Sequence, residues 1–509
     1  MYFRIGVFGI NLVIETDNAP HVKGLLDYVY ESKKYNFFLK QWRTEKIRGH
    51  IYNRKTTKNG MTYFELGIGW VFYILTVFKD YILKDDYDAV VKEIMQPTYR
   101  THPFPELRDY QNEDVLYMLK YKFGLFSCFT GYGKSQVIAI IANDFYKQGK
   151  KIILVTPNKK ARDELVKRIY NLYGIEVSTK LGIGKIQAII TSGLLNRKEM
   201  KSDEGRKAVK KELETFDVLL SDEVEYTMND SGFFIYDHVV NAQYRYGFSG
   251  TADKGSANMI STAQGICNET VAENKNLIKY FGTALIYRLP KSLIVNRITV
   301  KTKSMNPMKL GAFDWNYDAM SNVYLEVMNN IFTNPDVCKT IVKVCKAYPL
   351  TFIPINNLAK IISTWIEEYF IGTFRILLVS HAGYTYYDLE GNKTEMTLQE
   401  ACDKIKAGEV DVIPSTSSGF RALDFPNLKN MLLFSGKVAG SLIQQVGRVS
   451  RQNEMNIITL APESDRGAIP IYTKGTKERD KMIASYYKDC DIRQKVVFES
   501  ELESLNNEN

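Results

Sequence analysis

The sequence has few of the residues that stabilise small extracellular folds or bind structural metals. Six cysteines are spread over 509 residues, and none forms a Cys-x-x-Cys pair or a group with one of the five histidines. This scatter argues against a disulfide framework and a structural zinc site, and it fits a reducing compartment. We therefore expect a cytoplasmic protein.

Long hydrophobic runs are also missing. The most apolar stretch, Leu66–Phe78, ends at Lys79 and is well short of the about 20 residues that span a bilayer. The N-terminus lacks a basic region followed by a small-residue cleavage site, so it does not read as a signal peptide. We expect no membrane partner.

An excess of acidic residues is absent, and the formal net charge is +9. An excess of this sign fits a protein that binds a polyanion such as nucleic acid. A lysine-rich solvated surface would give the same value, so the charge leaves both interpretations open.

The first part of the chain predicts a small α+β block. Strand-like runs lie at residues 2–8, 11–14, 47–52 and 61–66, and a helical run lies at 22–31. A basic turn with Arg54, Lys55 and Lys58 ends in Asn59-Gly60, a pair that favours a hairpin. This hairpin is a candidate for gripping duplex DNA, and a solvated turn is an equal alternative.

From Leu107 onward, short apolar strands alternate with helices, for example at 134–148 and 159–173. This alternation is typical of parallel sheets covered by helices on both faces, and it occurs twice. The strands are expected at residues 123–129, 151–156, 186–191, 216–221 and 244–249, and again at 351–355, 376–380, 410–415, 430–434 and 455–460.

These patterns predict an α/β protein with two parallel-sheet domains in tandem behind the α+β block. The length agrees with about three or four domains. The expected boundaries are 1–97 for an N-terminal accessory domain, 98–295 for the first sheet domain, 296–335 for a linker, 336–490 for the second sheet domain and 491–509 for an acidic, disordered tail.

The first chemical motif is a phosphate-binding loop, Cys128-Phe-Thr-Gly-Tyr-Gly-Lys-Ser135, between a predicted strand and a predicted helix. Glycines let backbone N–H groups turn toward phosphate oxygens, and a helix N-terminus adds partial positive charge. Lys134 would reach the β- and γ-phosphates, and the Ser135 hydroxyl would hold Mg²⁺. The predicted ATP contacts of the loop are Thr130, Gly131, Tyr132, Gly133, Lys134 and Ser135.

The second motif is an acidic pair, Asp222-Glu223, at the end of an apolar strand. We assign Asp222 to Mg²⁺ and Glu223 to the attacking water as general base. The third motif is Gln444-Gln-Val-Gly-Arg-Val-Ser-Arg451. Arg448 and Arg451 would neutralise charge on a γ-phosphate, and Gln444 is counted with them as catalytic.

Together these motifs resemble the superfamily 2 helicases, over roughly residues 107–475. The resemblance implies two RecA-like P-loop motor domains that use ATP and Mg²⁺. It implies that Gln111 reads the adenine edge, with Arg108 or Tyr110 beside the ring. It also implies coupling of hydrolysis to domain motion through Ser249 and Thr251. The nucleic-acid contacts that it implies are Pro157, Asn158, Arg162, Thr191, Ser192, Asn356, Ser415 and Thr416.

The chain departs from the family pattern at several places. Cys128 stands where the strict motif has Gly, a position at which the family accepts other small residues. Glu225 stands where relatives often have His or Asp, which leaves its coupling to the segment Ser249-Gly-Thr-Ala252 open. Ala422 stands where the family usually has Gly, within a segment at 415–426 that resembles another family motif.

Within the superfamily, the motifs look most like the DNA-remodelling subgroup, which includes the phage UvsW-type branch-migration helicases and the XPB- and RecG-like motors. This resemblance implies an ATP-dependent helicase or translocase on single-stranded, forked or branched DNA, in recombination, repair and replication. Single-strand-binding or recombination proteins would be its partners, in the host cytoplasm if the source is a phage. An RNA helicase, a duplex-translocating motor subunit of a larger complex and an ATP-gated clamp without catalysis stay open as alternatives.

Overall fold

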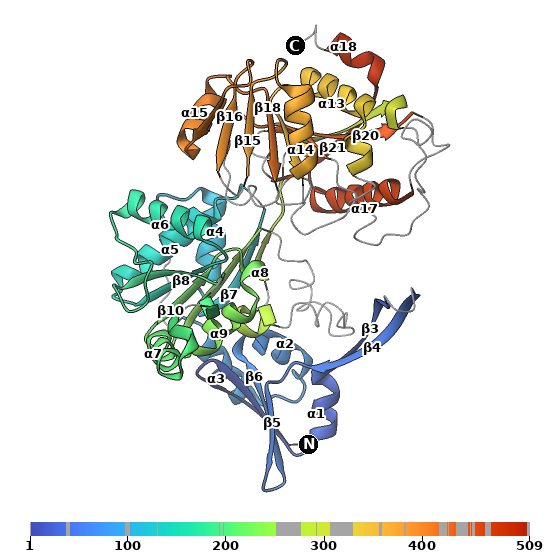
Figure 1. Ribbon diagram of the computed structural model, residues 1–509. Helices are drawn as coiled ribbons and strands as arrows, with labels where there is room; N and C mark the ends of the chain where they lie inside the picture. The colour runs from blue at the N-terminus through green and yellow to red at the C-terminus, as the bar shows by residue number, and fades with distance from the viewer. Residues whose placement is uncertain are drawn as a thin grey trace. The chain divides into compact units, whose positions relative to one another are not determined.

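The computed structural model divides the chain into two compact units (Figure 1). The first comprises Met1–Cys128 and Tyr132–Arg288, and the second comprises Phe129–Gly131 and Leu289–Asn509. No helix among the described residues is both long and apolar enough to cross a membrane. The structure describes residues 2–36, 41–96, 102–129, 131–192, 194–196, 198–250, 276–282, 284–291, 293–305, 329–355, 359–380, 383–416, 425, 427–433, 446–447, 449, 453–463 and 470–505.

A four-stranded antiparallel sheet lies at the centre of the N-terminal block. Its spatial order is β1 (Phe3–Phe8), β2 (Asn11–Thr16), β6 (Met61–Gly67) and β5 (Arg54–Lys58). The strands predicted at 2–8, 11–14 and 61–66 are confirmed. Strand β5 takes up most of the predicted basic turn, and the turn itself is Asn59-Gly60, where both residues have positive φ (52° and 75°).

The remaining N-terminal elements differ in part from the prediction. Helix α1 (Ala19–Leu26) ends at Asp27, where strand β3 (Asp27–Asn36) begins, so the predicted helix at 22–31 is wrong over its second half. Strand β3 pairs along its whole length with β4 (Gln41–His50) in a separate antiparallel ribbon. This cross-strand pairing, which helical spacing cannot reveal, favours the extended form. Helices α2 (Val71–Val77) and α3 (Lys84–Ile94) complete the block.

The first motor sheet is fully parallel, as predicted. Its order is β12 (Ala284–Arg288), β7 (Phe123–Cys128), β11 (Tyr244–Ser249), β10 (Val218–Ser221), β8 (Ile152–Thr156) and β9 (Ile186–Ile190). All six residues of β7 are buried, because helices cover both faces of a parallel sheet. The sequence did not predict β12. The main helices are α4 (Asp109–Met118), α5 (Lys134–Lys147), α6 (Lys159–Tyr173), α7 (Asp203–Leu213), α8 (Val224–Thr227) and α9 (Asp230–His238).

The N-terminal block packs on the amino end of this sheet through very close backbone contacts. A Cβ added to Gly69 would lie 1.7 Å from the carbonyl oxygen of Ile278 and 2.5 Å from the nitrogen of Gly282. Phe123 and Ile278 belong to the same buried cluster as the N-terminal core. The buried cluster of the N-terminal block therefore extends into the first sheet domain, which also has a core cluster of its own.

The second unit is built on a nine-stranded mixed sheet. Its order is β17 (Lys393–Met396), β16 (Tyr384–Tyr387), β15 (Ile376–Val379), β18 (Val412–Thr416), β14 (Thr351–Ile355), β19 (Asn430–Leu432), β20 (Glu454–Pro462), β13 (Ile294–Thr302) and β21 (Asp491–Phe498). Strands β15 through β17 form an antiparallel meander, and the other pairs are parallel. The five predicted strands are confirmed and pair in parallel, whereas the antiparallel strands β16 and β17 and the strands β13 and β21 at one edge of the parallel part were not predicted. Its helices include α13 (Pro335–Ala347), α14 (Ala359–Trp365), α15 (Leu398–Lys406), α17 (Pro470–Tyr486) and α18 (Leu502–Leu505).

Two predicted segments are wrong. The linker expected at 296–335 begins inside β13, which pairs with both β20 and β21. The tail expected to be disordered from 491 contains β21, which forms an edge of the sheet. Both strands are about half polar, and in β21 only Val497 is buried, so their sequences carry little of the apolar pattern that marks a strand.

Candidate nucleotide site

The phosphate loop has the backbone that its sequence predicts. It follows β7, and Gly131 and Gly133 adopt positive φ angles of 95° and 97°. Lys134 is the first residue of α5, so the helix N-terminus opens directly behind the loop. Left-handed glycines that lead into a helix turn backbone N–H groups inward, which creates a cradle for anionic oxygens.

Gln111 braces this loop. Its side chain is buried, its amide donates to the carbonyl oxygen of Tyr132 at 2.6 Å, and its carbonyl accepts from the backbone N–H of Arg108 at 2.9 Å. A Cβ on Gly133 would come within 2.8 Å of the same amide. Gln111 therefore contacts the loop itself, while Arg108 is exposed and donates to the Tyr110 hydroxyl at 2.9 Å.

The acidic pair stands at the carboxyl end of β10, two strands away from β7 in the sheet. Asp222 is buried, with 7% of its surface exposed, and Glu223 is half-buried. Burial raises the pKa of Asp222 to about 7, and the neighbouring charge of Glu223 adds to the rise. The backbone N–H of Glu223 donates to Asp222 Oδ1 at 2.9 Å.

Glu223 adopts a left-handed backbone conformation with φ of 45°. This region is unfavourable for residues with a Cβ by roughly 1–2 kcal/mol. Such strain is common at functional sites, where the surrounding structure holds it in place.

Lys134 lies between the loop and the acidic pair. Its Nζ is 3.8 Å from Glu223 Oε1. Burial by itself would lower the pKa of Lys134, but the charges of Glu223, Cys128, Asp222 and Glu225 outweigh it and raise the pKa. Lys134 is therefore a fixed cation within reach of two carboxylates.

These residues fit a nucleoside triphosphate with Mg²⁺. The loop N–H groups and Lys134 would hold the phosphates, while Ser135 and Asp222 would hold the metal. Mg²⁺ at phosphate sites is usually bound by one or two carboxylates together with phosphate oxygens and water. No group of three or more His, Cys, Asp or Glu residues that could hold a metal exists among the described residues. When bound, the metal would neutralise charge on the phosphates, and Glu223 would orient the attacking water.

The predicted nucleic-acid residues of the first domain have different surroundings. Asn158 caps α6 by accepting from the backbone N–H of Ala161 at 3.0 Å, and Arg162 pairs with Asp163 at 2.7 Å. Thr191 is buried and accepts from Asn229 at 3.4 Å, whereas Ser192 is exposed. Pro157 is buried at the end of β8.

In the second domain, Ser415 is fully buried and Thr416 is half-buried at the end of β18. Ser249 is buried at the end of β11. Within the arginine motif, Val446 and Val449 pack in the core of the second sheet. The predicted residues that lie outside the described residues are Thr130, Thr251, Asn356, Gln444, Arg448 and Arg451.

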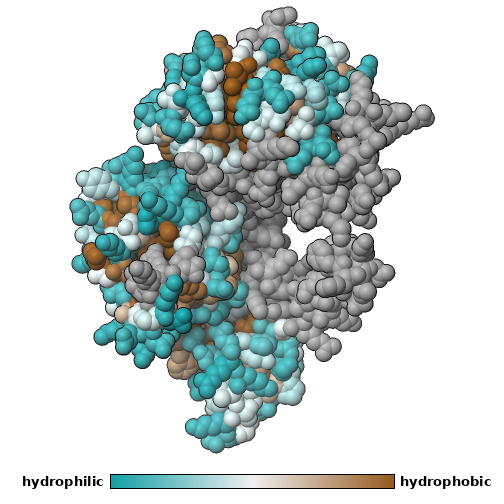
Figure 2. All heavy atoms as spheres, in the orientation of Figure 1, coloured by the Kyte–Doolittle hydropathy of each residue, from teal (hydrophilic) through white to brown (hydrophobic). Residues whose placement is uncertain are grey.

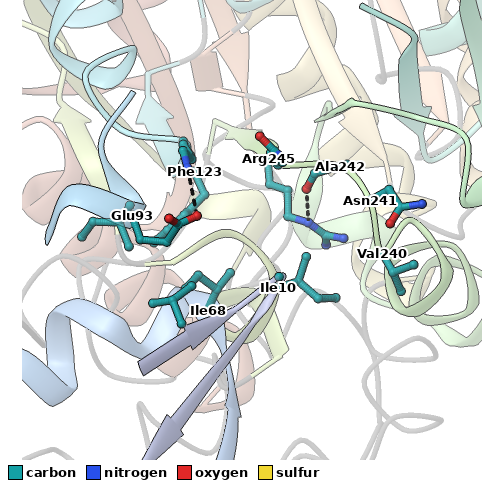
Figure 3. Close-up of a pocket in the computed structure, with 13 residues that line it drawn as sticks. Ile10, Ile68, Glu93, Phe123, Val240, Asn241, Ala242 and Arg245 are labelled. Carbon is teal, nitrogen blue, oxygen red and sulfur yellow. Dashed lines mark hydrogen bonds and ion pairs between the residues drawn. The ribbon is translucent and has the colours of Figure 1, made fainter. Parts of the chain in front are cut away.

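A cavity of about 150 Å³ lies at the other end of the first sheet, where the N-terminal block meets it (Figure 3). Figure 3 shows Ile10 and Ile68 facing Arg245 across this seam. The Arg245 guanidinium is buried. It donates to the carbonyl oxygen of Tyr236 in α9 at 3.4 Å and to that of Ala242, just after the helix, at 3.1 Å. Burial lowers the pKa of Arg245 to about 10. The Arg245 side chain thus satisfies carbonyl oxygens at the C-terminal end of α9. No residue of the phosphate loop lines the cavity.

Comparison with known families agrees with the site. Residues 104–254 match the family described as type III restriction enzyme, res subunit. This range contains the phosphate loop, the acidic pair and β11. A comparison with curated protein sequences found no match.

Several solved helicase structures match the chain at low identity. UvsW of phage T4 is 14% identical, with 98% of this chain and 100% of that chain covered and a TM-score of 0.37. Dbp5 of S. cerevisiae, bound to RNA and ADP BeF3, is 11% identical, with 79% and 93% covered and a TM-score of 0.48. Lhr of Mycobacterium smegmatis, bound to ssDNA and AMP-PNP, is 16% identical, with 74% and 49% covered and a TM-score of 0.44.

The matched family covers the residues that form the phosphate loop and the acidic pair, and a second motor-type sheet follows them in the chain. The similarity to the Res-subunit family is therefore established for residues 104–254, which contain both the phosphate loop and the acidic pair.

Proposed function

We propose that this chain is an ATP-dependent DNA helicase or translocase that remodels branched DNA, as in fork regression, branch migration, recombination and repair. The observation that carries the ATPase part is the pre-formed set of Lys134, Asp222 and Glu223 beside a phosphate loop with two left-handed glycines. ATP with Mg²⁺ is the proposed cofactor. The motor activity would take place in the cytoplasm, of the host if the source is a phage.

The choice of DNA is supported by the motif resemblance to UvsW-type enzymes and by the positive net charge. An RNA helicase is the second candidate, since Dbp5 was solved bound to RNA whereas Lhr was solved bound to ssDNA. A duplex-translocating subunit of a larger complex is a third candidate, because the matched family is named for a restriction-enzyme subunit.

The decisive experiment is a substrate panel. ATP hydrolysis is measured with matched single-stranded DNA, single-stranded RNA, forks, Holliday junctions, R-loops and plain duplex, for the wild type and for Lys134→Ala. We expect the strongest stimulation by forks or junctions, and a loss of about 10²–10³-fold in Lys134→Ala. Strongest stimulation by RNA would favour the second candidate, and ATPase indifferent to every nucleic acid would refute the proposal.

The N-terminal block is proposed to hold duplex DNA through the hairpin of β5 and β6. All five residues of β5 are exposed, and the strand carries Arg54, Lys55 and Lys58. The lower end of the molecule, where β5 projects in Figure 1, is mainly hydrophilic in Figure 2. Side chains of this kind would contact backbone phosphates and carry no sequence preference.

Changing these three residues to Glu tests the hairpin. We expect weaker fork binding and a slope of log affinity against log salt that falls by about 2–3, because each lost phosphate contact contributes about 0.9. The matched control changes three exposed lysines near and on α7, Lys201, Lys207 and Lys211, to Glu. If the hairpin variant binds forks as tightly as the wild type, or if the control loses as much affinity, the hairpin has no specific role in DNA binding.

A further inference from the structure

Two residues of α4 hold Tyr132, the residue between the two loop glycines. Gln111 donates to its carbonyl oxygen, and Asp114, one turn further on, accepts from its hydroxyl at 2.8 Å. The Tyr132 side chain is 1% exposed and contacts the rings of Phe126 and Tyr110 edge-on. The phosphate loop is therefore fixed at its centre by both the backbone and the side chain of one residue.

Asp114 has a second partner at the end of β12. Arg288 Nε and Nη2 donate to the two oxygens of Asp114 at 2.8 Å and 2.7 Å. Arg288 lies beside Cys128 in the register of β12 with β7, and Cys128 is the residue from which the loop starts. Arg288 is also the last residue of the first compact unit before Leu289.

We propose that Asp114 is a positioning residue for nucleotide binding. It joins Tyr132 to Arg288, and so it fixes the phosphate loop in its open cradle against the strand from which the chain leaves the first unit. Neither Asp114 nor Arg288 belongs to a motif that the sequence singled out. The proposal rests on nucleotide binding alone and is independent of whether the substrate is DNA.

The chemistry of the three groups suits this role. Burial, and then the hydrogen bond to Asp114, raise the pKa of the Tyr132 phenol, so the hydroxyl stays protonated and remains a donor. The hydrogen bond between Arg288 and Asp114 raises the pKa of the Arg288 guanidinium, which stays a cation. Bidentate arginine–carboxylate pairs have defined geometry, so Asp114 has little freedom to turn away from Tyr132.

The test removes one hydroxyl. In Tyr132→Phe the ring still packs, but the bond to Asp114 is lost. We expect the Kd for ADP and for a non-hydrolysable ATP analogue, measured by fluorescence without nucleic acid, to rise about tenfold, as for a lost hydrogen bond to a charged group. KM for ATP should rise with it, while kcat at saturating ATP changes little. Arg288→Lys, which keeps the charge but loses the paired geometry, should raise Kd in the same direction by less.

The matched control is Tyr246→Phe. Tyr246 is also fully buried in the first motor domain, and its hydroxyl donates to the carbonyl oxygen of Tyr121 at 2.6 Å, away from the loop. This variant should lower Tm and leave Kd unchanged. Three outcomes would each overturn the proposal: unchanged Kd in Tyr132→Phe, an equal rise in Tyr246→Phe, or fully additive effects in the double variant Tyr132→Phe with Asp114→Asn.

Discussion

Asp222 is held in an environment that disfavours its charged form. Its pKa of about 7 lies well above the ordinary value of 3.8, and burial is the main cause. Between these two pH values the folded protein keeps a proton that the unfolded chain gives up. The resulting contribution to stability is present at low pH and is lost as the pH rises through about 7.

This charge state predicts a pH-dependent effect of Asp222→Asn. Without nucleotide and Mg²⁺, the difference in Tm between the variant and the wild type should shift in favour of the variant by about 2–4 °C from pH 5 to pH 8. Differential scanning calorimetry at both pH values measures this. A difference that is equal at the two pH values would contradict the assignment.

The same carboxylate should govern metal binding. Mg²⁺ requires the deprotonated form, so the apparent affinity for Mg²⁺ with nucleotide should increase from pH 6 to pH 8 in the wild type. The buried negative charge of Asp222 therefore lowers the stability of the ligand-free protein above about pH 7, and bound Mg²⁺ would compensate for that charge.

At the scale of elements, the contact between the N-terminal block and the motor sheet depends on the absence of a side chain at Gly69. Alanine there would place its Cβ 1.7 Å from the carbonyl oxygen of Ile278, so backbone must move. We expect Gly69→Ala to lower the free energy of unfolding by about 1–3 kcal/mol, as overpacked cores do. Urea denaturation of the full chain measures the change.

Gly24→Ala is the control for that variant. Gly24 lies inside α1, and a Cβ there meets no atom within 4 Å. Alanine in a helix interior should stabilise the protein by about 0.5–1 kcal/mol. If both variants have the same stability, the close contact at Gly69 does not hold the two elements together.

Strand β21 offers a second prediction at this scale, from two adjacent valines. Val497 is 2% exposed within the core of the second sheet, and Val496 is 58% exposed. Val497→Ala should cost about 1–2 kcal/mol of stability through the cavity that it leaves, whereas Val496→Ala should stay within about 0.5 kcal/mol of the wild type. Equal effects in thermal or urea unfolding would mean that the C-terminal segment is not part of the sheet.

At the scale of the whole molecule, the proposed nucleotide contacts belong to the first sheet domain, and the arginine motif belongs to the second. The sequence predicts that Arg448 stabilises the transition state and contributes little to ground-state binding. Arg448→Ala should therefore leave the Kd for ATP analogues near that of the wild type and lower kcat by about 10³-fold.

Steady-state ATPase assays together with analogue binding check this prediction. Arg451→Ala, three residues further, is the companion variant. A loss of binding that equals the loss of kcat would instead give Arg448 a role in holding the nucleotide in the ground state.

The sequence alone determined the class of fold and predicted the residues of a nucleotide site. Apolar strands that alternate with helices predicted both parallel sheets, since strand and helix periodicities are local properties. The phosphate loop, Asp222 and Glu223 could be assigned because each needs a fixed residue type directly after a buried strand.

Tertiary structure alone decided what depends on partners distant in the chain. Strands β13 and β21 were missed because both are about half polar, and their strand form depends on pairing with distant segments: β13 pairs with β20 and β21, and β21 pairs with β13. Asp114 and Arg288 were missed for a similar reason. They are separated by 174 positions, and only the fold brings the carboxylate and the guanidinium together beside Tyr132.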